Sequence, residues 1–291
     1  GDYAGLVDIG EQYLALATDG VGTKLLVAEA VDDYSTVGID CIAMNVNDLV
    51  AAGIEPVAFV DYLAVEQPSE ETSRQIGEGL QTGAKLADIK LIGGETAVMP
   101  DVITGLDIAG TCAGLAPKGS PFPGEAQPGD VLVGWPSSGI HSNGLTLARE
   151  ALTRENEYTD PFPPDTSKTI GEELLEPTRI YTDVLDSLRA SDAHAAAHVT
   201  GGGWRNLLRM GSYAYDIEDP FEAQPIFEMI QREGEVSEKE MHRTFNMGTG
   251  FVAALDPEKA DQVLETTEDS RQIGTVQTGE ESVSIRGLTL S

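Results

Sequence analysis

One segment governs how the chain folds: Val37-Gly38-Ile39-Asp40-Cys41-Ile42-Ala43-Met44-Asn45-Val46-Asn47-Asp48-Leu49-Val50-Ala51-Ala52-Gly53. Its apolar residues recur at steps of three and four and fill one arc of about 120°, as in an amphipathic helix. Gly53 supplies a helix stop, and Pro56 prevents the helix from continuing. The segment therefore predicts a helix that packs by one face.

The opposite side of this helix carries short polar side chains. Asp40, Asn47 and Asp48 fall within an arc of about 100°. Asp and Asn hold their oxygens close to the backbone, as hard cations require, whereas a solvated face usually carries Lys, Glu and Arg. Two interpretations stay open: a cation-binding face, or an ordinary polar face in an acidic protein.

Length and composition limit the class of protein. A chain of 291 residues can bury a large core and is expected to form two domains. It contains no run of 18 apolar residues, so no membrane span is predicted. Cys41 and Cys112 are the only two cysteines, which is typical of a reduced, cytoplasmic protein without a disulfide framework or a cysteine zinc site.

The charge is strongly negative. Forty-nine acidic residues against 18 Lys and Arg give −31. Such a surface repels nucleic acid and anionic membranes, so we expect neither as a partner. The acidic residues are spread along the chain and do not form a tail, which favours adaptation to concentrated salt, that is, a halophilic protein. Salt should then stabilise the fold by screening repulsion.

The first predicted domain, residues 1–120, reads β-α-β-α-β-β, which is an α+β order. Strands are expected over 12–17, 57–65, 89–92 and 106–116, with a second helix over 69–86. A segment rich in Pro and Gly, 117–128, separates this domain from a second one over 128–291, for which we predict an α/β fold.

Two glycine-containing turns of the first domain present acidic residues. Asp19-Gly-Val-Gly-Thr-Lys24 could cradle phosphate through its amides, with Lys24 on the phosphate and Asp19 on a cation; a simple tight turn between strands is the alternative. Gly93-Gly-Glu-Thr96 is a second such turn. Converging acids and glycine turns indicate a nucleotide–Mg²⁺ site more than a catalytic carboxylate pair.

The second domain contains two further loops of interest. A strand feeds the small-residue loop 137–144, and a helix follows, which makes an anion site. His141 in this loop could be a general acid or base, a hydrogen-bond donor, or a structural histidine. Thr200-Gly-Gly-Gly203 is a glycine turn entering a helix, and we interpret His198 just before it as a core histidine. A helix is also predicted from Pro177 to about Arg189.

Eight motifs together resemble the phosphoribosylformylglycinamidine cyclo-ligases, also called aminoimidazole ribonucleotide synthetases. Each motif is weak alone, and their order along the chain makes the set specific. They are Asp19-Gly-Val-Gly-Thr-Lys24, Gly38-Ile-Asp40, Val46-Asn-Asp48, Gly93-Gly-Glu-Thr96, Gly139-Ile-His-Ser-Asn-Gly144, Pro177-Thr-Arg-Ile-Tyr181, Thr200-Gly-Gly-Gly203 and Arg243-Thr-Phe-Asn246.

The resemblance implies a homodimer whose N-terminal sheets combine into a barrel, with an α/β domain behind. It also implies the reaction, in which ATP phosphorylates the formyl oxygen of formylglycinamidine ribonucleotide and a substrate nitrogen then closes the imidazole ring. ATP and Mg²⁺ are the expected cofactors. A related ATP-dependent kinase or synthetase of the selenophosphate or thiamine-phosphate type, or a non-catalytic nucleotide-binding scaffold, are the alternatives.

The resemblance also implies roles for single residues. Asp19, Asp48 and His141 are expected to be catalytic, and Asp19, Asp48 and Asp40 to hold metal. The substrate is expected on Ser142, Asn143, Thr200 and Gly201. The nucleotide is expected on Gly20, Gly22, Thr23, Lys24, Asn47, Gly93, Gly94, Glu95 and Thr96.

Overall fold

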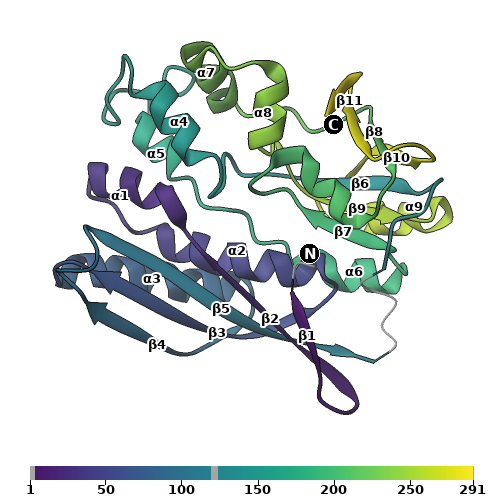
Figure 1. Cartoon of the computed structure of the whole chain (residues 1–291), viewed down its shortest axis with the longest axis horizontal. Coiled ribbons are helices and arrows are strands. Elements are labelled where there is room, and N and C mark those ends of the chain that lie inside the picture. The colour runs from purple at the N-terminus through teal and green to yellow at the C-terminus, as the bar shows by residue number, and fades with distance from the viewer. Residues whose placement is uncertain (1–3, 119–123, 291) are drawn as a thin grey trace.

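Two β-sheets, one in each half of the chain, form the frame of the molecule (Figure 1). The computed structural model describes residues 4–118 and 124–290. Helices pack on both sheets, and helix α2 (Val37–Ala51) lies between the two halves. The predicted α+β class with two domains is confirmed.

The first domain contains a five-stranded sheet in the order β1-β2-β5-β3-β4. β3 and β4 are parallel, and the other neighbouring strands are antiparallel. The strands are β1 (Gly5–Asp8), β2 (Gln12–Gly20), β3 (Glu55–Val65), β4 (Lys90–Val98) and β5 (Leu106–Pro117). The helical segments are η1 (Gly22–Lys24), α1 (Leu25–Val31), α2 and α3 (Glu70–Leu86).

Helices α2 and α3 cover one face of this sheet and touch backbone to backbone (Figure 1). A Cβ atom added to Gly38 would lie 2.2 Å from the Leu80 nitrogen, so only glycine permits this approach. Ser69 caps α3 as predicted, because its Oγ accepts a hydrogen bond from the Thr72 amide at 3.2 Å.

The second domain contains a seven-stranded sheet in the order β12-β11-β8-β10-β6-β9-β7. Its strands are β6 (Val131–Pro136), β7 (Ala195–His198), β8 (Ala214–Ile217), β9 (Thr249–Leu255), β10 (Arg271–Gln277), β11 (Ser282–Ile285) and β12 (Leu288–Leu290). Its helical segments are α4 (Leu145–Leu152), α5 (Ile170–Leu174), η2 (Thr182–Val184), α6 (Leu185–Ala190), η3 (Gly203–Met210), α7 (Pro225–Gly234), α8 (Glu238–Thr244) and α9 (Pro257–Thr266).

One alternative is excluded and two local predictions are wrong. The Asp19–Lys24 turn leads into helix α1, so it is not the tight turn between two strands that was the alternative. Gly93 and Gly94 lie inside β4 because both pair with β3. The segment 177–181 is not helical, and regular structure resumes only at η2, because its backbone groups bond to the first domain instead of to a helical turn.

The prediction that α2 packs by one face only is also wrong, since Asp40 and Asn47 on its polar side are fully buried. The Asp40 carboxylate accepts hydrogen bonds from the backbone N–H and the hydroxyl of Thr178, at 2.9 and 2.6 Å. Its other oxygen lies 2.8 Å from the buried Lys24 ammonium, which also donates to the Glu176 carbonyl at 2.7 Å. These contacts fasten the second domain to the first.

The predicted linker, 117–128, lies between β5 and β6. Residues 119–123 within it, and the predicted domain ends at 1, 120 and 291, lie outside the described residues. The domain limits therefore stay predictions. Among the described residues, no helix combines the length and apolar character needed to cross a membrane.

Replacing Asp40 by Asn should destabilise the fold by about 3–5 kcal/mol, because it leaves the Lys24 ammonium buried without a counter-charge. The amide has nearly the shape of the carboxylate, so the loss of stability reflects the missing charge and not a change in side-chain volume. Urea unfolding monitored by circular dichroism measures it.

Glu78→Gln is the matched control, since it removes one carboxylate from the exposed Arg74–Glu78 pair. Its effect should be far smaller. Equal unfolding midpoints for the two variants would show that the Lys24–Asp40 pair does not hold the domains together.

Candidate active site

Five residues from both domains meet beside helix α2, and we call them the interdomain cluster: Asp19, Asp48, Asn143, His198 and Gly201. Asp19 stands near the end of β2, where Asn45 of α2 donates a hydrogen bond to its carbonyl at 3.2 Å. Its carboxylate accepts the Gly20 amide at 2.8 Å. Asp48 follows one turn along the same helix, so α2 positions both acids.

Asp48 contacts the second domain through a histidine. The Asp48 Oδ1 lies 3.0 Å from Nδ1 of His198, the last residue of β7. The Asp48 side chain keeps 21% of its surface exposed, whereas His198 is fully buried. Asp48 therefore uses one oxygen for the imidazole while the carboxylate still reaches the surface.

The two acids influence each other electrostatically. The pKa of Asp19 is raised, chiefly because the surrounding protein keeps water away and also because of the negative charge of Asp48. The Gly20 amide and His198 oppose this rise. A cation bound between the acids would remove the repulsion, so this pair has the chemistry of a metal position.

Within the described ranges, no group of three or more His, Cys, Asp or Glu side chains is placed so that the protein alone could hold a metal ion. Asp40, predicted as a metal ligand, bonds to Lys24 and Thr178 instead. Mg²⁺ is commonly held by one or two carboxylates together with substrate phosphates. Asp19 and Asp48 fit such a shared site.

The glycine turn after Asp19 divides into an accessible part and a buried part. Gly22 takes a left-handed φ of 68° and starts η1, and Thr23 is exposed, with its hydroxyl 3.3 Å from that of Thr146. Lys24 is fully buried against Asp40. The predicted phosphate contact of Lys24 does not fit this placement, because its ammonium is enclosed by protein oxygens.

Asn47 also differs from its predicted role toward the nucleotide. It is buried, and its amide donates to the Arg179 carbonyl at 2.8 Å while its Oδ1 accepts the Tyr181 amide at 2.9 Å. These bonds fix the segment that joins α5 to η2. Asn47 therefore organises the contact between the domains.

The small-residue loop of the second domain reaches the same place. The Ser142 hydroxyl donates to the Val21 carbonyl at 2.8 Å, and the Asn143 amide lies 3.7 Å from the Met44 sulfur. Gly201 is adjacent, since a Cβ there would lie 3.1 Å from Asn143 Oδ1. Ser142 thus lies against the Asp19–Lys24 turn and Asn143 against α2, while Gly201 lies beside Asn143 and Thr200 precedes Gly201 directly.

His141 belongs to this loop, but its side chain is buried and does not reach the loop surface. It is 1% exposed and has a left-handed φ of 62°, and its Nε2 accepts the Ser138 amide at 3.1 Å. Its Nδ1 is buried and has no hydrogen-bond partner among the described residues. Burial, followed by the nearby positive groups, holds the pKa of His141 well below its usual value, so the ring is neutral at pH 7.

The motif Gly93-Gly-Glu-Thr96 is separated from the cluster within this chain. Gly94 pairs with Asp61, which pairs with Gly110, which pairs with Asp19. Three strand spacings of about 4.8 Å therefore separate Gly94 from Asp19. Glu95 is exposed on β4, at the edge of the sheet.

Sequence reasoning did not predict that Asn45 shapes the cluster or that His198 contacts it. Both sit in apolar surroundings that look like core. The signal for Asn45 was an amide on the otherwise apolar side of α2. For His198 the signal was its position just before a glycine turn.

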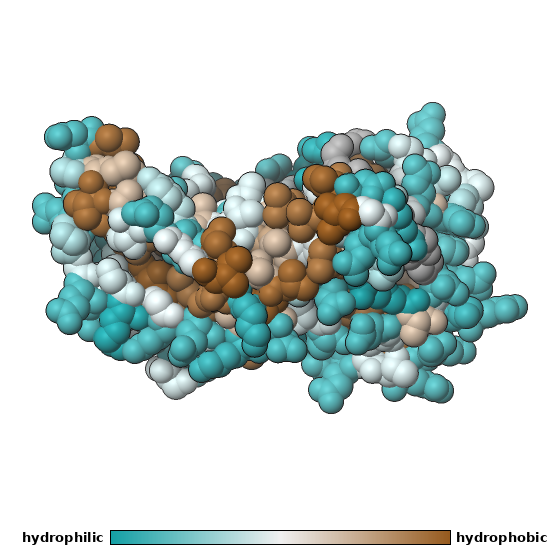
Figure 2. Space-filling view, turned by 90° about the horizontal axis from the view of Figure 1, so that it is seen from below, coloured by the Kyte–Doolittle hydropathy of each residue, from teal (hydrophilic) through white to brown (hydrophobic). Residues whose placement is uncertain are grey.

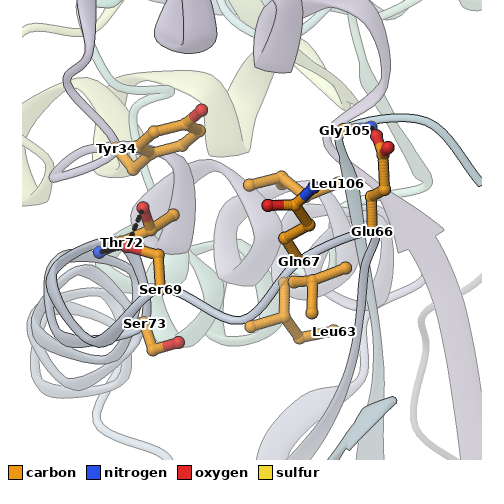
Figure 3. A pocket seen from close by; sticks show the side chains of 10 residues that line it. Tyr34, Leu63, Glu66, Gln67, Ser69, Thr72, Ser73, Gly105 and Leu106 are labelled. Atoms are coloured by element: carbon orange, nitrogen blue, oxygen red, sulfur yellow. Dashed lines mark hydrogen bonds between the residues drawn. The ribbon is translucent and has the colours of Figure 1, made fainter. Parts of the chain in front are cut away.

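A separate pocket of about 190 Å³ opens at the start of α3 (Figure 3). The Tyr34 ring lies on one side, and Ser69 and Thr72 line the helix side. Glu66 closes another wall by accepting the Gly105 amide at 2.8 Å. None of the predicted site residues lines this pocket.

Comparison with known proteins shows the family and the fold. The model of the AIR synthase related protein N-terminal domain matches residues 1–116, and that of the C-terminal domain matches residues 127–286. Among solved structures, a thiamine monophosphate kinase from Aquifex aeolicus is similar, with a TM-score of 0.68 at 19% identity over 99% of this chain and 92% of that one. The hydrogenase maturation protein HypE in complex with ATP has a TM-score of 0.65 at 16% identity over 96% of this chain and 83% of that one. These distant matches show the fold.

Curated relatives are much closer in sequence. The phosphoribosylformylglycinamidine cyclo-ligase of Methanosarcina acetivorans is 54% identical over 269 residues, which is 92% of this chain and 81% of that protein. The cyclo-ligase of Pyrococcus furiosus is 48% identical over 281 residues, 95% of this chain and 83% of that protein. The chain therefore belongs to the AIR synthase related family and, within it, to the phosphoribosylformylglycinamidine cyclo-ligases.

Proposed function

We propose that the chain catalyses the ATP-dependent closure of formylglycinamidine ribonucleotide to aminoimidazole ribonucleotide, a step of purine biosynthesis. The observation that carries this proposal is the interdomain cluster. It places two acids suited to a metal–nucleotide complex next to the Asn143 loop and the Gly201 turn, in a chain about half identical to curated cyclo-ligases.

In this proposal the chain acts mainly by positioning the reactants. Phosphoryl transfer to the formyl oxygen needs alignment and charge neutralisation, and it turns that oxygen into a leaving group. A substrate nitrogen then attacks the same carbon, and phosphate departs. Mg²⁺ would neutralise the polyphosphate; Asp19 and Asp48 would hold it, while Ser142, Asn143 and the 200–203 turn would hold the substrate.

His141 serves in this scheme as a neutral hydrogen-bonding group. Because its Nε2 accepts the Ser138 amide, the ring proton belongs on Nδ1, the buried nitrogen without a described partner. A proton shuttle near pH 7 would require a pKa close to 7, and burial lowers the pKa of His141 away from that value.

We also propose that two copies associate through the outer face of the first sheet. Large apolar residues are exposed there on three strands, and Figure 2 shows brown residues gathered on the side seen from below. They are Val7 on β1, Leu16 on β2, and Val60 and Tyr62 on β3, which the strand register places on the same face. Exposed apolar patches of this kind mark interfaces.

A cytoplasmic location and adaptation to concentrated salt complete the proposal. The two thiols are free and buried, which suits a reducing compartment. The charge of −31 per chain suits high salt, because screening relieves repulsion within and between subunits.

The first test is ADP release with and without formylglycinamidine ribonucleotide. We expect release only with this acceptor. Asp48→Asn should lower Mg²⁺–ATP affinity by at least the roughly 10–100-fold that loss of a metal ligand's hydrogen-bonding neighbour costs. Asp261→Asn, an exposed site on α9, is the control that should behave as wild type.

Other outcomes separate the alternatives. Release with a different acceptor, such as thiamine phosphate or selenide, would identify a related kinase or synthetase. ATP binding without release for any acceptor would identify a non-catalytic scaffold.

The second test is the pH dependence of stability in His141→Asn, since asparagine tolerates the left-handed backbone at this position. Unfolded His141 takes up a proton below about pH 6.5, whereas the folded ring stays neutral. Wild-type stability should therefore fall as the pH drops from about 6.5 to 5, with a contribution of up to about 1.4 kcal/mol per pH unit from His141. The variant should lack this contribution. Parallel stability curves in denaturant titrations would contradict a neutral, buried His141.

The third test is sedimentation equilibrium across KCl concentrations. A dimer should persist at molar KCl and dissociate at low salt, where two chains of −31 repel each other. Val60→Lys on β3 should give monomers at both salt concentrations. Leu86→Lys, at an exposed apolar site on α3, should still form dimers at molar KCl. A dimer that survives Val60→Lys would place the interface elsewhere.

A further inference from the structure

The imidazole of His198 is held between two neighbouring side chains of α2. Its Nδ1 lies 3.0 Å from Asp48 Oδ1, and its Nε2 lies 3.3 Å from the Asn47 amide nitrogen. The ring is fully buried, and the Tyr181 ring meets it nearly edge-on, with centroids 6.3 Å apart. A histidine needed only for packing would require neither polar contact.

The position of the ring proton follows from Asn47. The Asn47 Oδ1 accepts the Tyr181 amide and its Nδ2 donates to the Arg179 carbonyl, so the two ends of this side chain cannot be exchanged. The nitrogen that faces His198 is therefore a donor, and its second hydrogen points to Nε2. Nε2 must accept, which places the ring proton on Nδ1, aimed at Asp48.

We infer that His198 is a positioning residue for the metal–nucleotide site: it donates a hydrogen bond to Asp48 Oδ1 and so turns the carboxylate to present its other oxygen to the cation. This inference rests on the proposed function for the identity of the ligand. Hydrogen-bonding neighbours of metal ligands fix the orientation of those ligands in this way.

The position of His198 in the chain adds a second role to this contact. The 200–203 turn, proposed to hold the substrate, begins two residues later, and its Gly201 lies next to Asn143. The same strand end therefore carries the residue that orients Asp48 and the turn that meets the substrate.

Two variants separate hydrogen bonding from packing. An asparagine amide nitrogen takes about the place of Nδ1, whereas a glutamine amide reaches about as far as Nε2. His198→Asn should therefore keep the Mg²⁺–ATP affinity within about threefold, while His198→Gln should weaken it about 10–100-fold and raise the Mg²⁺ concentration needed for half-maximal ATP binding.

The chain offers a matched control in His194. Its Nδ1 also contacts an aspartate, Asp130, at 2.9 Å, but this pair lies within the second domain and away from the cluster. His194→Gln should leave Mg²⁺–ATP binding unchanged. Calorimetric titration of Mg²⁺ and ATP without any acceptor, together with melting temperatures, tests all three variants whether or not the proposed reaction occurs.

Nitrogen NMR of the wild-type protein gives a reading that needs no variant. We expect Nδ1 of His198 to carry the proton that faces Asp48, and the His198 signals, unlike those of His194, to shift when Mg²⁺–ATP is added. A proton on Nε2, signals unaffected by Mg²⁺–ATP, or equal affinities for His198→Gln and His194→Gln would each overturn the inference. The inference would also be overturned if the loss of affinity in His198→Asn and His198→Gln simply paralleled their loss of melting temperature.

Discussion

The burial of polar groups along α2 is the constraint on which the structure depends. Asp40, Asn47 and, in part, Asp48 leave water on folding, and an unpaired buried polar group or charge is costly. Apart from Lys24, which pairs with Asp40 inside the first domain, the partners that satisfy them are in the second domain: Thr178, Arg179, Tyr181 and His198. The two domains therefore cannot separate without leaving these groups unsatisfied.

This constraint also locates the candidate site. The same helix that fastens the domains carries Asn45, which contacts the Asp19 backbone, and Asp48. The second domain supplies Asn143 and Gly201 at the edge of the contact between the two domains. The proposed nucleotide and substrate positions are adjacent because the hydrogen bonds that assemble the molecule end at this place.

Much of the architecture followed from local signals. The periodicity of 37–53 predicted α2, Ser69 predicted the start of α3, and apolar runs predicted β3 and β5, because these elements depend on near neighbours in the chain. The helix expected from Pro177 did not form, since the backbone of 177–181 is engaged by Asp40 and Asn47 from more than 130 residues away. Such a long-range contact leaves no local pattern.

The absence of a local pattern also explains which site residues were predicted wrongly. Asp40 and Asp48 look alike on a helical projection, but Lys24 and Thr178 enclose Asp40 whereas Asp48 reaches the surface. His198 has the apolar neighbours of a core residue, so its bond to Asp48 was not visible in its own segment. Asp19, Asp48 and the 142–143 loop were predicted together because the order of the motifs along the chain resembles that of one family.

Burial gives the Lys24–Asp40 pair a further property. Dissolved ions weaken attraction between charges that water surrounds, as around Arg74 and Glu78, whose side chains are more than half exposed. Counter-ions have no access to Lys24 and Asp40, whose side chains are wholly enclosed. The ion pair that holds Glu176 and Thr178 of the second domain therefore keeps its strength across a wide range of ionic conditions, while the acidic exterior responds to each change.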